Sequence, residues 1–187
     1  MKRMLISIFS AAAFLLAQDM DARRFSVSTN MLGYLYLGTF NLETSYGFSR
    51  HWSLTAGAEF NPFTFRMQGG DRQFQSRQQS YELGARYWPW HVYSGWWVAA
   101  KARYREYNHG GLISLKTEEG DGFGIGLSAG YSYMIHPRLN LEFGLGLWSG
   151  VRKFTLYDCP SCGNTLDSGV KGFILPDELL LSLVYVF

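Results

Sequence analysis

Apolar and polar residues alternate along most of this chain. In runs of about ten residues, apolar side chains take every second position and small or charged side chains take the positions between them. This period of two is typical of β-strands that have one apolar and one polar face. Seven such runs are expected, at residues 40–48, 52–60, 81–87, 96–104, 123–133, 139–147 and 179–187. The stretch from Phe25 to Leu37 alternates poorly, and it is assigned as a further strand by counting rather than by pattern.

The links between these runs alternate in length. Short links are expected at 49–50, 89–95 and 136–138, and long links at 61–80, 108–122 and 152–177. In an up-and-down barrel this alternation places all the long links at one end and the short turns, with both termini, at the other. Each run is long enough for a tilted strand to cross a bilayer, and lipid offers no partner to an open sheet edge. The sequence therefore predicts an all-β fold, an eight-stranded antiparallel up-and-down transmembrane β-barrel.

Composition agrees with one strand-rich domain. The 187 residues include 17% aromatic residues, 21 Gly and only 5 Pro, while charged residues are sparse at 17%. The formal net charge of +2 is accounted for by Lys2 and Arg3, and no basic stripe stands out. Nucleic acid is therefore not expected as a partner.

The first residues have the pattern of a secretory signal peptide. Lys2 and Arg3 precede an apolar run from Met4 to Leu16, which is too short to span a bilayer. Cleavage is expected after Ala17 or Ala22, which divides the chain into a signal peptide at 1–22 and a barrel at 23–187. The alternative is an N-terminal helix that is buried in the fold.

Periodicity alone does not decide which face meets lipid, because a soluble lipocalin-like barrel alternates in the same way. Three features favour the bacterial outer membrane and its lipid. Aromatic residues lie near the ends of the strands, as interfacial girdles require. The last residues alternate and include Tyr185 and Phe187, which resembles the terminal signal read by the barrel-insertion machinery. The polar face is small and charged, as the narrow lumen of an eight-stranded barrel requires.

Acidic and basic residues balance on the predicted inner face. The expected lumen charge network consists of Glu43, Glu59, Glu82, Glu142, Arg86, Lys101, Arg103 and Arg105. Buried charges are tolerated when they are paired and hydrogen-bonded. The balance predicts an interlocked plug, and the alternative is a path for protons or ions.

Cys159 and Cys162 form the sharpest local motif, a C-x-x-C in a predicted outer loop. In an exported protein we expect them to form a local disulfide. A zinc half-site would need two more ligands, of which His109 is one candidate, and a redox motif would need a thioredoxin-type scaffold. No metal site and no cofactor is predicted.

Catalytic groups are sparse. His109 is the one histidine on the predicted outer side, with Ser114, Glu118 and Glu119 near it in sequence. These residues keep open the alternative of a lipid-modifying barrel enzyme. Apolar residues in the long links, such as Phe173, predict packing within the loops or contact with a partner. We assign no catalytic residue and expect a protein that is not an enzyme.

Several short segments are similar to a known family. They are Asn61–Phe63, Glu82–Trp88, Tyr107–Gly111, Leu127–Tyr131, Leu139–Glu142 and, most specifically, Tyr157–Gly163. On these segments the chain resembles the Bacteroidota family catalogued as domain of unknown function 3575, over nearly the whole mature chain. The stretch Phe173–Asp177 departs from the usual ending of the family. The resemblance implies an exported barrel and, because some members are encoded beside fimbrial genes, a role in anchoring or assembling surface fimbriae.

The leading hypothesis is thus a small outer-membrane barrel with a plugged polar lumen. Its role is structural or linked to surface assembly, with fimbrial or other surface proteins as partners. A lipid-modifying barrel enzyme and a soluble, lipocalin-like binder of apolar ligands are the alternatives.

Overall fold

The computed structural model describes residues 25–35, 38–66, 73–110, 116–158 and 164–187. Nine strands and one short helix are found in these ranges. They are β1 (Phe25–Asn30), α2 (Met31–Leu35), β2 (Phe40–Gly47), β3 (Trp52–Asn61), β4 (Thr64–Arg66), β5 (Gln73–Tyr87), β6 (Gly95–Gly110), β7 (Thr117–His136), β8 (Leu139–Tyr157) and β9 (Thr165–Val186). Within the described residues, no helix is long and apolar enough to cross a membrane.

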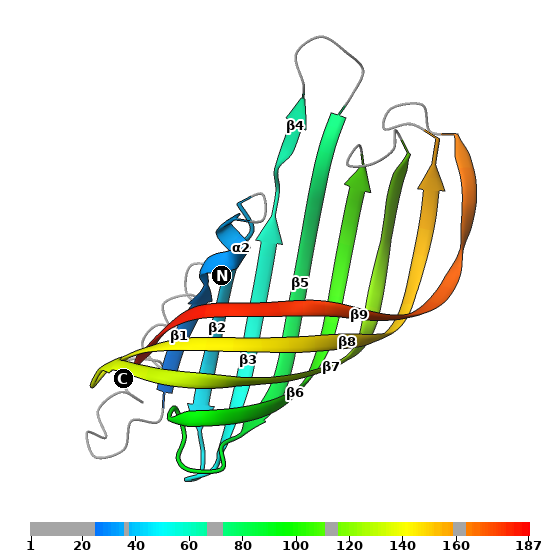
Figure 1. Ribbon diagram of the computed structural model, residues 1–187. Coiled ribbons are helices and arrows are strands. Elements are labelled where there is room, and N and C mark those ends of the chain that lie inside the picture. Colours follow the sequence, from blue (N-terminus) through cyan, green and yellow to red (C-terminus); the bar gives the residue numbers. More distant parts are fainter. Residues whose placement is uncertain (1–24, 36–37, 67–72, 111–115, 159–163) are drawn as a thin grey trace, which may run out of the picture.

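Eight strands close into an antiparallel barrel (Figure 1). Apart from β4, each strand pairs with the strands before and after it in the chain, and β1 pairs with β9 to close the sheet. Strand β3 pairs with β5 along its whole length, from Trp52 to Asn61. The short β4 pairs with β5 and extends that hairpin beyond the wall. The predicted fold class is confirmed.

The predicted long links are wrong in extent, because most of their residues are in strands. Strand β6 continues to Gly110 and β7 begins at Thr117. Likewise β8 continues to Tyr157 and β9 begins at Thr165. On β6 and β7 these extensions are polar on both faces, and on β9 exposed apolar residues such as Leu166 and Val170 are separated by polar residues and Gly. The extensions therefore lack the regular alternation by which the strands were found. They lie together at one end of the barrel, and the short turns lie at the other (Figure 1).

The first strand was also predicted too long. Strand β1 ends at Asn30, and the chain then turns through α2, where a strand to Leu37 was expected. The Asn30 side chain holds this corner, since its Oδ1 accepts hydrogen bonds from the Leu32 and Leu181 backbone N–H groups at 3.2 and 3.1 Å. The weak alternation after Asn30 therefore reflects a real end of the strand.

The barrel is apolar outside and polar inside, which confirms the predicted orientation of the two faces. Leu127 and Leu145 project outward and are 62% and 66% exposed. Ser128, next to Leu127 on β7, and Lys101, opposite Gly126 on β6, lie on the inner side and are buried. An apolar band thus surrounds a polar interior, the reverse of a soluble lipocalin-like barrel.

Aromatic residues border the apolar band on the side of the long hairpins. In the strand register Phe40 faces Phe60, and Tyr104 stands between Tyr81 and Phe123. All five side chains are at outward positions of the strands, and we call them the loop-side row. The next outward pair on β6 and β7 is Glu106 opposite Asp121, so the surface becomes polar directly beyond the row.

A second set of aromatic residues borders the band on the side of the short turns. Outward ring pairs occur there between neighbouring strands, with centroids 5.0 Å apart for Trp52 and Tyr87 and 5.2 Å apart for Trp96 and Tyr131. Phe187 lies 5.8 Å from Phe25 and 5.0 Å from Tyr185 by the same measure. We call these residues the turn-side row, and it includes Tyr185 and Phe187, the predicted insertion signal.

Candidate functional site

The inner face of the barrel gathers the eight charged residues that the sequence placed there. They come from five strands: Glu43 from β2, Glu59 from β3, Glu82 and Arg86 from β5, Lys101, Arg103 and Arg105 from β6, and Glu142 from β8. Each takes part in at least one ion pair, and the basic members are buried or nearly so. The arrangement joins strands that are far apart in the sheet.

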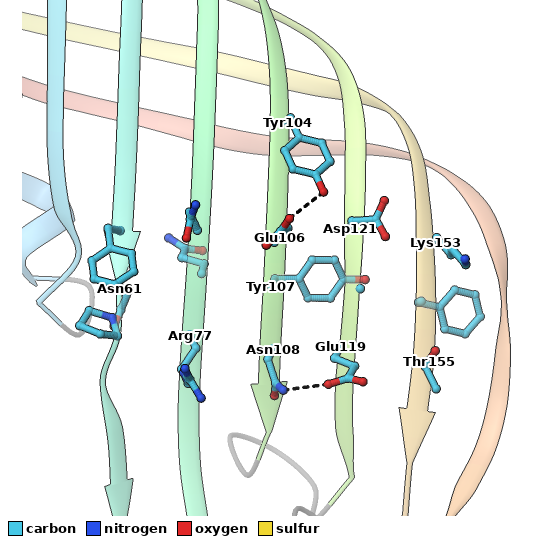
Figure 2. A pocket seen from close by; sticks show the side chains of 16 residues that line it. Asn61, Arg77, Tyr104, Glu106, Tyr107, Asn108, Glu119, Asp121, Lys153 and Thr155 are labelled. Carbon is cyan, nitrogen blue, oxygen red and sulfur yellow. Dashed lines mark hydrogen bonds between the residues drawn. The ribbon is translucent and has the colours of Figure 1, made fainter. Parts of the chain in front are cut away.

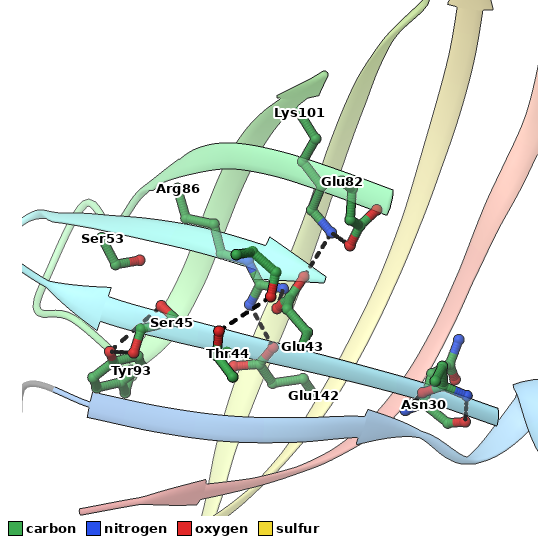
Figure 3. A network of polar contacts seen from close by, with 12 residues as sticks. Asn30, Glu43, Thr44, Ser45, Ser53, Glu82, Arg86, Tyr93, Lys101 and Glu142 are labelled. Carbon is green, nitrogen blue, oxygen red and sulfur yellow. Dashed lines mark hydrogen bonds and ion pairs between the residues drawn. The ribbon is translucent and has the colours of Figure 1, made fainter. Parts of the chain in front are cut away.

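Six of these charges form one continuous chain of ion pairs (Figure 3). Arg86 contacts both Glu43 and Glu142, the latter at 2.8 Å between Nη1 and Oε2. Lys101 Nζ donates to Glu43 at 2.8 Å and to Glu82 at 3.0 Å. The chain contains as many acids as bases when Arg103 is included, so its charges compensate one another.

Arg103 ends this chain with a two-point contact. Its Nε and Nη2 donate to one carboxylate oxygen of Glu82, at 3.1 and 2.6 Å. Glu59 and Arg105 form a separate and looser pair at 3.7 Å, nearer the long hairpins, where Ser80 Oγ also donates to Glu59 at 3.0 Å. Paired and hydrogen-bonded in this way, the charges compensate one another inside the barrel.

Aromatic side chains close the interior on the short-turn side of the ion pairs. Trp88 and Tyr93 belong to the link between β5 and β6 and Trp97 to the start of β6, and they are 0%, 5% and 1% exposed. The Arg86 guanidinium lies over the Trp97 ring, 4.4 Å from its centroid. We call Trp88, Tyr93 and Trp97 the aromatic cork.

Hydrogen bonds to the surrounding wall fix the cork. Trp88 Nε1 donates to Ser53 Oγ at 3.1 Å, and the Tyr93 hydroxyl donates to the Ser45 carbonyl at 3.1 Å. The Tyr93 carbonyl accepts from Asn140 Nδ2 at 2.7 Å. Tyr93 adopts a left-handed backbone with φ of 65°, which a non-glycine residue rarely does.

The cork was not predicted: Tyr93 lies in the link 89–95, which was expected to be an ordinary short turn, and Trp88 and Trp97 flank that link. One clue was available. Trp97 alternates with the outward Trp96 and Val98, and so had to point inward.

Glycines on the inner face make room for the large side chains. A Cβ atom on Gly57 would lie 2.7 Å from Glu82 Oε1. One on Gly130 would lie 2.3 Å from the Phe143 carbonyl oxygen and 2.5 Å from the Trp97 ring. The inward glycines of the polar face are therefore a packing requirement of the plug.

Near the long hairpins, another aromatic group covers the lumen. Trp148 is 4% exposed and meets Phe173 edge-on at 4.4 Å between centroids. Arg105 lies over the Trp148 ring at 4.8 Å. The prediction that Phe173 belongs to an outer loop is thus wrong, because this residue is part of β9 and packs into the wall.

The histidine of the enzyme alternative lies inside this end of the barrel. His109 Nδ1 is 3.1 Å from Ser76 Oγ, and Glu118 is its neighbour on β7. Glu118 is already bonded to the Tyr107 hydroxyl at 2.8 Å and to Arg152 at 3.2 Å. Ser76 is 0% exposed, so a substrate carbonyl cannot reach its hydroxyl in this conformation.

Two other residues, Ser114 and Glu119, were also predicted near His109. Ser114 lies outside the described residues, and Glu119 points to the outer surface, where it accepts a hydrogen bond from Asn108. Ser76, which the sequence did not single out, is the serine that contacts the histidine. Burial lowers the pKa of His109, and the nearby positive charge of Arg105 lowers it further.

Cys159 and Cys162 lie outside the described residues, and so does the predicted signal peptide. Both remain predictions. Within the described ranges, no group of three or more His, Cys, Asp or Glu residues is arranged to hold a metal ion.

The comparison with known families agrees with the motifs of the sequence. The chain belongs to the family described as "Protein of unknown function (DUF3575)", which matches residues 6–187. No curated protein matches the chain. The family is therefore established, and its description assigns no activity.

Proposed function

We propose that this member of the family is a structural, non-enzymatic β-barrel of the bacterial outer membrane whose lumen is sealed. The observation that supports this most is the exposed apolar band between the loop-side and turn-side rows. Large aliphatic side chains exposed all around a closed sheet would be a severe aggregation hazard in water. In a bilayer the same side chains contact acyl chains, and the aromatic rows lie at the two interfaces.

The height of the band fits a membrane. Strand β6 advances eight residues from Trp96 in one row to Tyr104 in the other. At about 3.4 Å per residue and a tilt of about 40°, this corresponds to roughly 20 Å, near the ~25 Å apolar band of outer-membrane barrels. A protein of this shape needs no spanning helix, because closure pairs the backbone groups of all strands.

Sealing of the lumen argues against transport. The ion-pair chain and the aromatic cork occupy the lumen with mutually bonded side chains, and the cavity beside Glu43, Glu82 and Arg86 measures about 60 Å³. The interior is also polar, which disfavours a lipocalin-like binder of apolar ligands. The buried Ser76 and the engaged Glu118 disfavour the lipid-modifying enzyme.

The protruding strands are the part that we assign to surface assembly. The extensions of β5, β6, β7, β8 and β9 project beyond the loop-side row, and we call them the collar (Figure 1). Fimbrial or other surface proteins are the proposed partners, an assignment that follows from the family resemblance by analogy. Pull-down with the collar intact, compared with a barrel whose extensions are shortened, tests this part.

Fractionation tests the proposed location. We expect the full-length protein in the outer-membrane fraction, resistant to alkaline extraction and soluble only with detergent. The folded barrel should also migrate differently from the heat-unfolded chain in a detergent gel. Recovery in the soluble fraction after lysis without detergent would contradict the proposal.

A further inference from the structure

A groove of about 550 Å³ lies on the outer surface of the collar (Figure 2). Its lining comes from five adjacent strands, β3, β5, β6, β7 and β8. Most of the lining residues are at outward positions, such as Tyr104, Glu106 and Asn108 on β6, and the inward Tyr107 between them also contributes to the lining. The groove is therefore on the outside of the barrel and is separate from the plugged lumen.

The groove begins where the apolar band ends. Tyr104 and Phe60 belong to the loop-side row and also line the groove. If the protein spans the outer membrane as proposed above, the groove is level with the headgroups of the outer leaflet. A ligand held there could keep its acyl chains against the apolar band below.

The lining is rich in groups that bond to hydroxyls. Glu106 and Asp121 stand directly opposite each other on β6 and β7, and Glu119 follows on β7. Like charges in directly opposite positions destabilise a sheet. The Tyr104 and Tyr157 hydroxyls already donate to Glu106 and Glu119, at 2.8 and 2.7 Å, which shows that these carboxylates accept hydroxyl donors. Further hydroxyl donors from a ligand would offset the repulsion between Glu106 and Asp121.

Positive charges flank the acidic centre. Arg77 is opposite Asn108 on the β5 side, and Lys153 is opposite Asp121 on the β8 side. Both line the groove. A bare acyl chain does not match so polar a lining, and a compact anion would be repelled by the carboxylates at the centre of the groove. A saccharide matches it better, because its hydroxyls bond to carboxylates and amides, its anionic substituents can reach the flanking bases, and its apolar faces can rest on aromatic rings.

We propose that this groove binds the saccharide headgroup of a glycolipid in the outer leaflet. The inference rests on the proposed membrane location. The proposed partner is a specific lipid, and its site is on the outer surface, apart from the lumen.

Binding of lipopolysaccharide to the detergent-solubilised full-length protein tests the proposal. Native mass spectrometry or a titration in mixed micelles would compare it with phosphatidylglycerol, an anionic lipid without sugar. We expect preferential binding of lipopolysaccharide. The double variant Glu106→Ala/Asp121→Ala should weaken that binding by about tenfold or more, because two charged acceptors are lost. Removing this like-charged pair should not lower the stability of the sheet.

A matched control is Asp167→Ala, since Asp167 is an exposed acid on β9 that does not line the groove. It should bind like the wild type. Equal affinity for both lipids, or unchanged binding by the double variant, would overturn the proposal. Equal affinity for the free saccharide, released from its acyl chains, would overturn the assignment to a membrane lipid.

Partitioning of the same preparation into phospholipid vesicles tests the membrane location separately from the glycolipid site. Protein that stays in the aqueous phase contradicts the outer-membrane proposal itself. Protein that inserts but shows no preference for lipopolysaccharide contradicts only the glycolipid site.

Discussion

Individual charged residues in the lumen form ion pairs with more than one partner. Arg86 holds carboxylates from β2 and β8, and Lys101 holds carboxylates from β2 and β5. Glu43 is the acid shared by both bases. In a region of low dielectric such sharing makes the loss of one acid costly, because two positive charges lose compensation together.

Replacing this shared acid gives the sharpest test of the network. The variant Glu43→Ala should lower the free energy of unfolding by about 3–5 kcal/mol, as for other broken buried ion pairs. Urea unfolding in phospholipid vesicles measures the change. The control is Glu59→Ala, because the Glu59 side chain is 28% exposed and its ion pair with Arg105 is 3.7 Å long. Similar costs for the two variants would contradict the shared role of Glu43.

His109 gives the collar a pH dependence. Its pKa is lowered in the folded protein by burial and by the charge of Arg105, with Glu118 opposing in part. Below the ordinary pKa of about 6.5 the unfolded chain takes up a proton that the folded protein resists, so stability should fall with decreasing pH. Above that pKa the contribution of His109 should be constant.

Comparing wild type with His109→Gln isolates this contribution. The difference in unfolding free energy between about pH 7.5 and about pH 5.5 should be smaller in the variant. An identical pH dependence in the two proteins would show that His109 titrates normally in the fold.

At the level of strands, alternation decides which face meets lipid. Leu145 lies in β8 between Ala129 of β7 and Leu179 of β9 and projects outward. The inner neighbours Gly144 and Gly146 leave space for the plug, and a Cβ on Gly144 would lie 3.1 Å from the Trp97 ring. One strand therefore serves lipid contact and lumen packing with alternate residues.

An arginine in the middle of the band tests this arrangement. Leu145→Arg should cost about 2–4 kcal/mol of stability in a bilayer, because a charge is placed among acyl chains. Thr155→Arg is the control, since Thr155 lies farther along β8, opposite Glu119 and beyond the loop-side row. It should cost about 0–1 kcal/mol, as charges near the interface do. Unfolding titrations in vesicles compare the two, and equal effects would place the membrane elsewhere.

For the molecule as a whole, the balance of buried charges and the aromatic cork predict a lumen that does not conduct ions. Planar-bilayer recordings should show no conductance steps after insertion, while a porin inserted under the same conditions confirms that the assay detects open channels. Regular ohmic steps from purified protein would contradict the sealed lumen, and with it the structural role proposed here.

The alternating pattern by itself determined the strands, their faces and the identity of the inward charges. Period two leaves little freedom, because a residue such as Glu82 must point away from Leu83 whatever the rest of the fold does. Long polar extensions escaped prediction, since a strand that is polar on both faces has no such pattern. The family could also be identified from short motifs alone.

Only the tertiary structure decided which charged residues of the lumen form ion pairs with one another and how the interior of the barrel is filled. Glu43 and Lys101 are far apart in the chain, and their contact depends on strand register and tilt. The packing of the aromatic cork likewise needs inner glycines such as Gly130, which leaves room for the Trp97 ring from another strand. Alternation specifies a direction for each side chain, whereas its contacts depend on the closed geometry of all the strands.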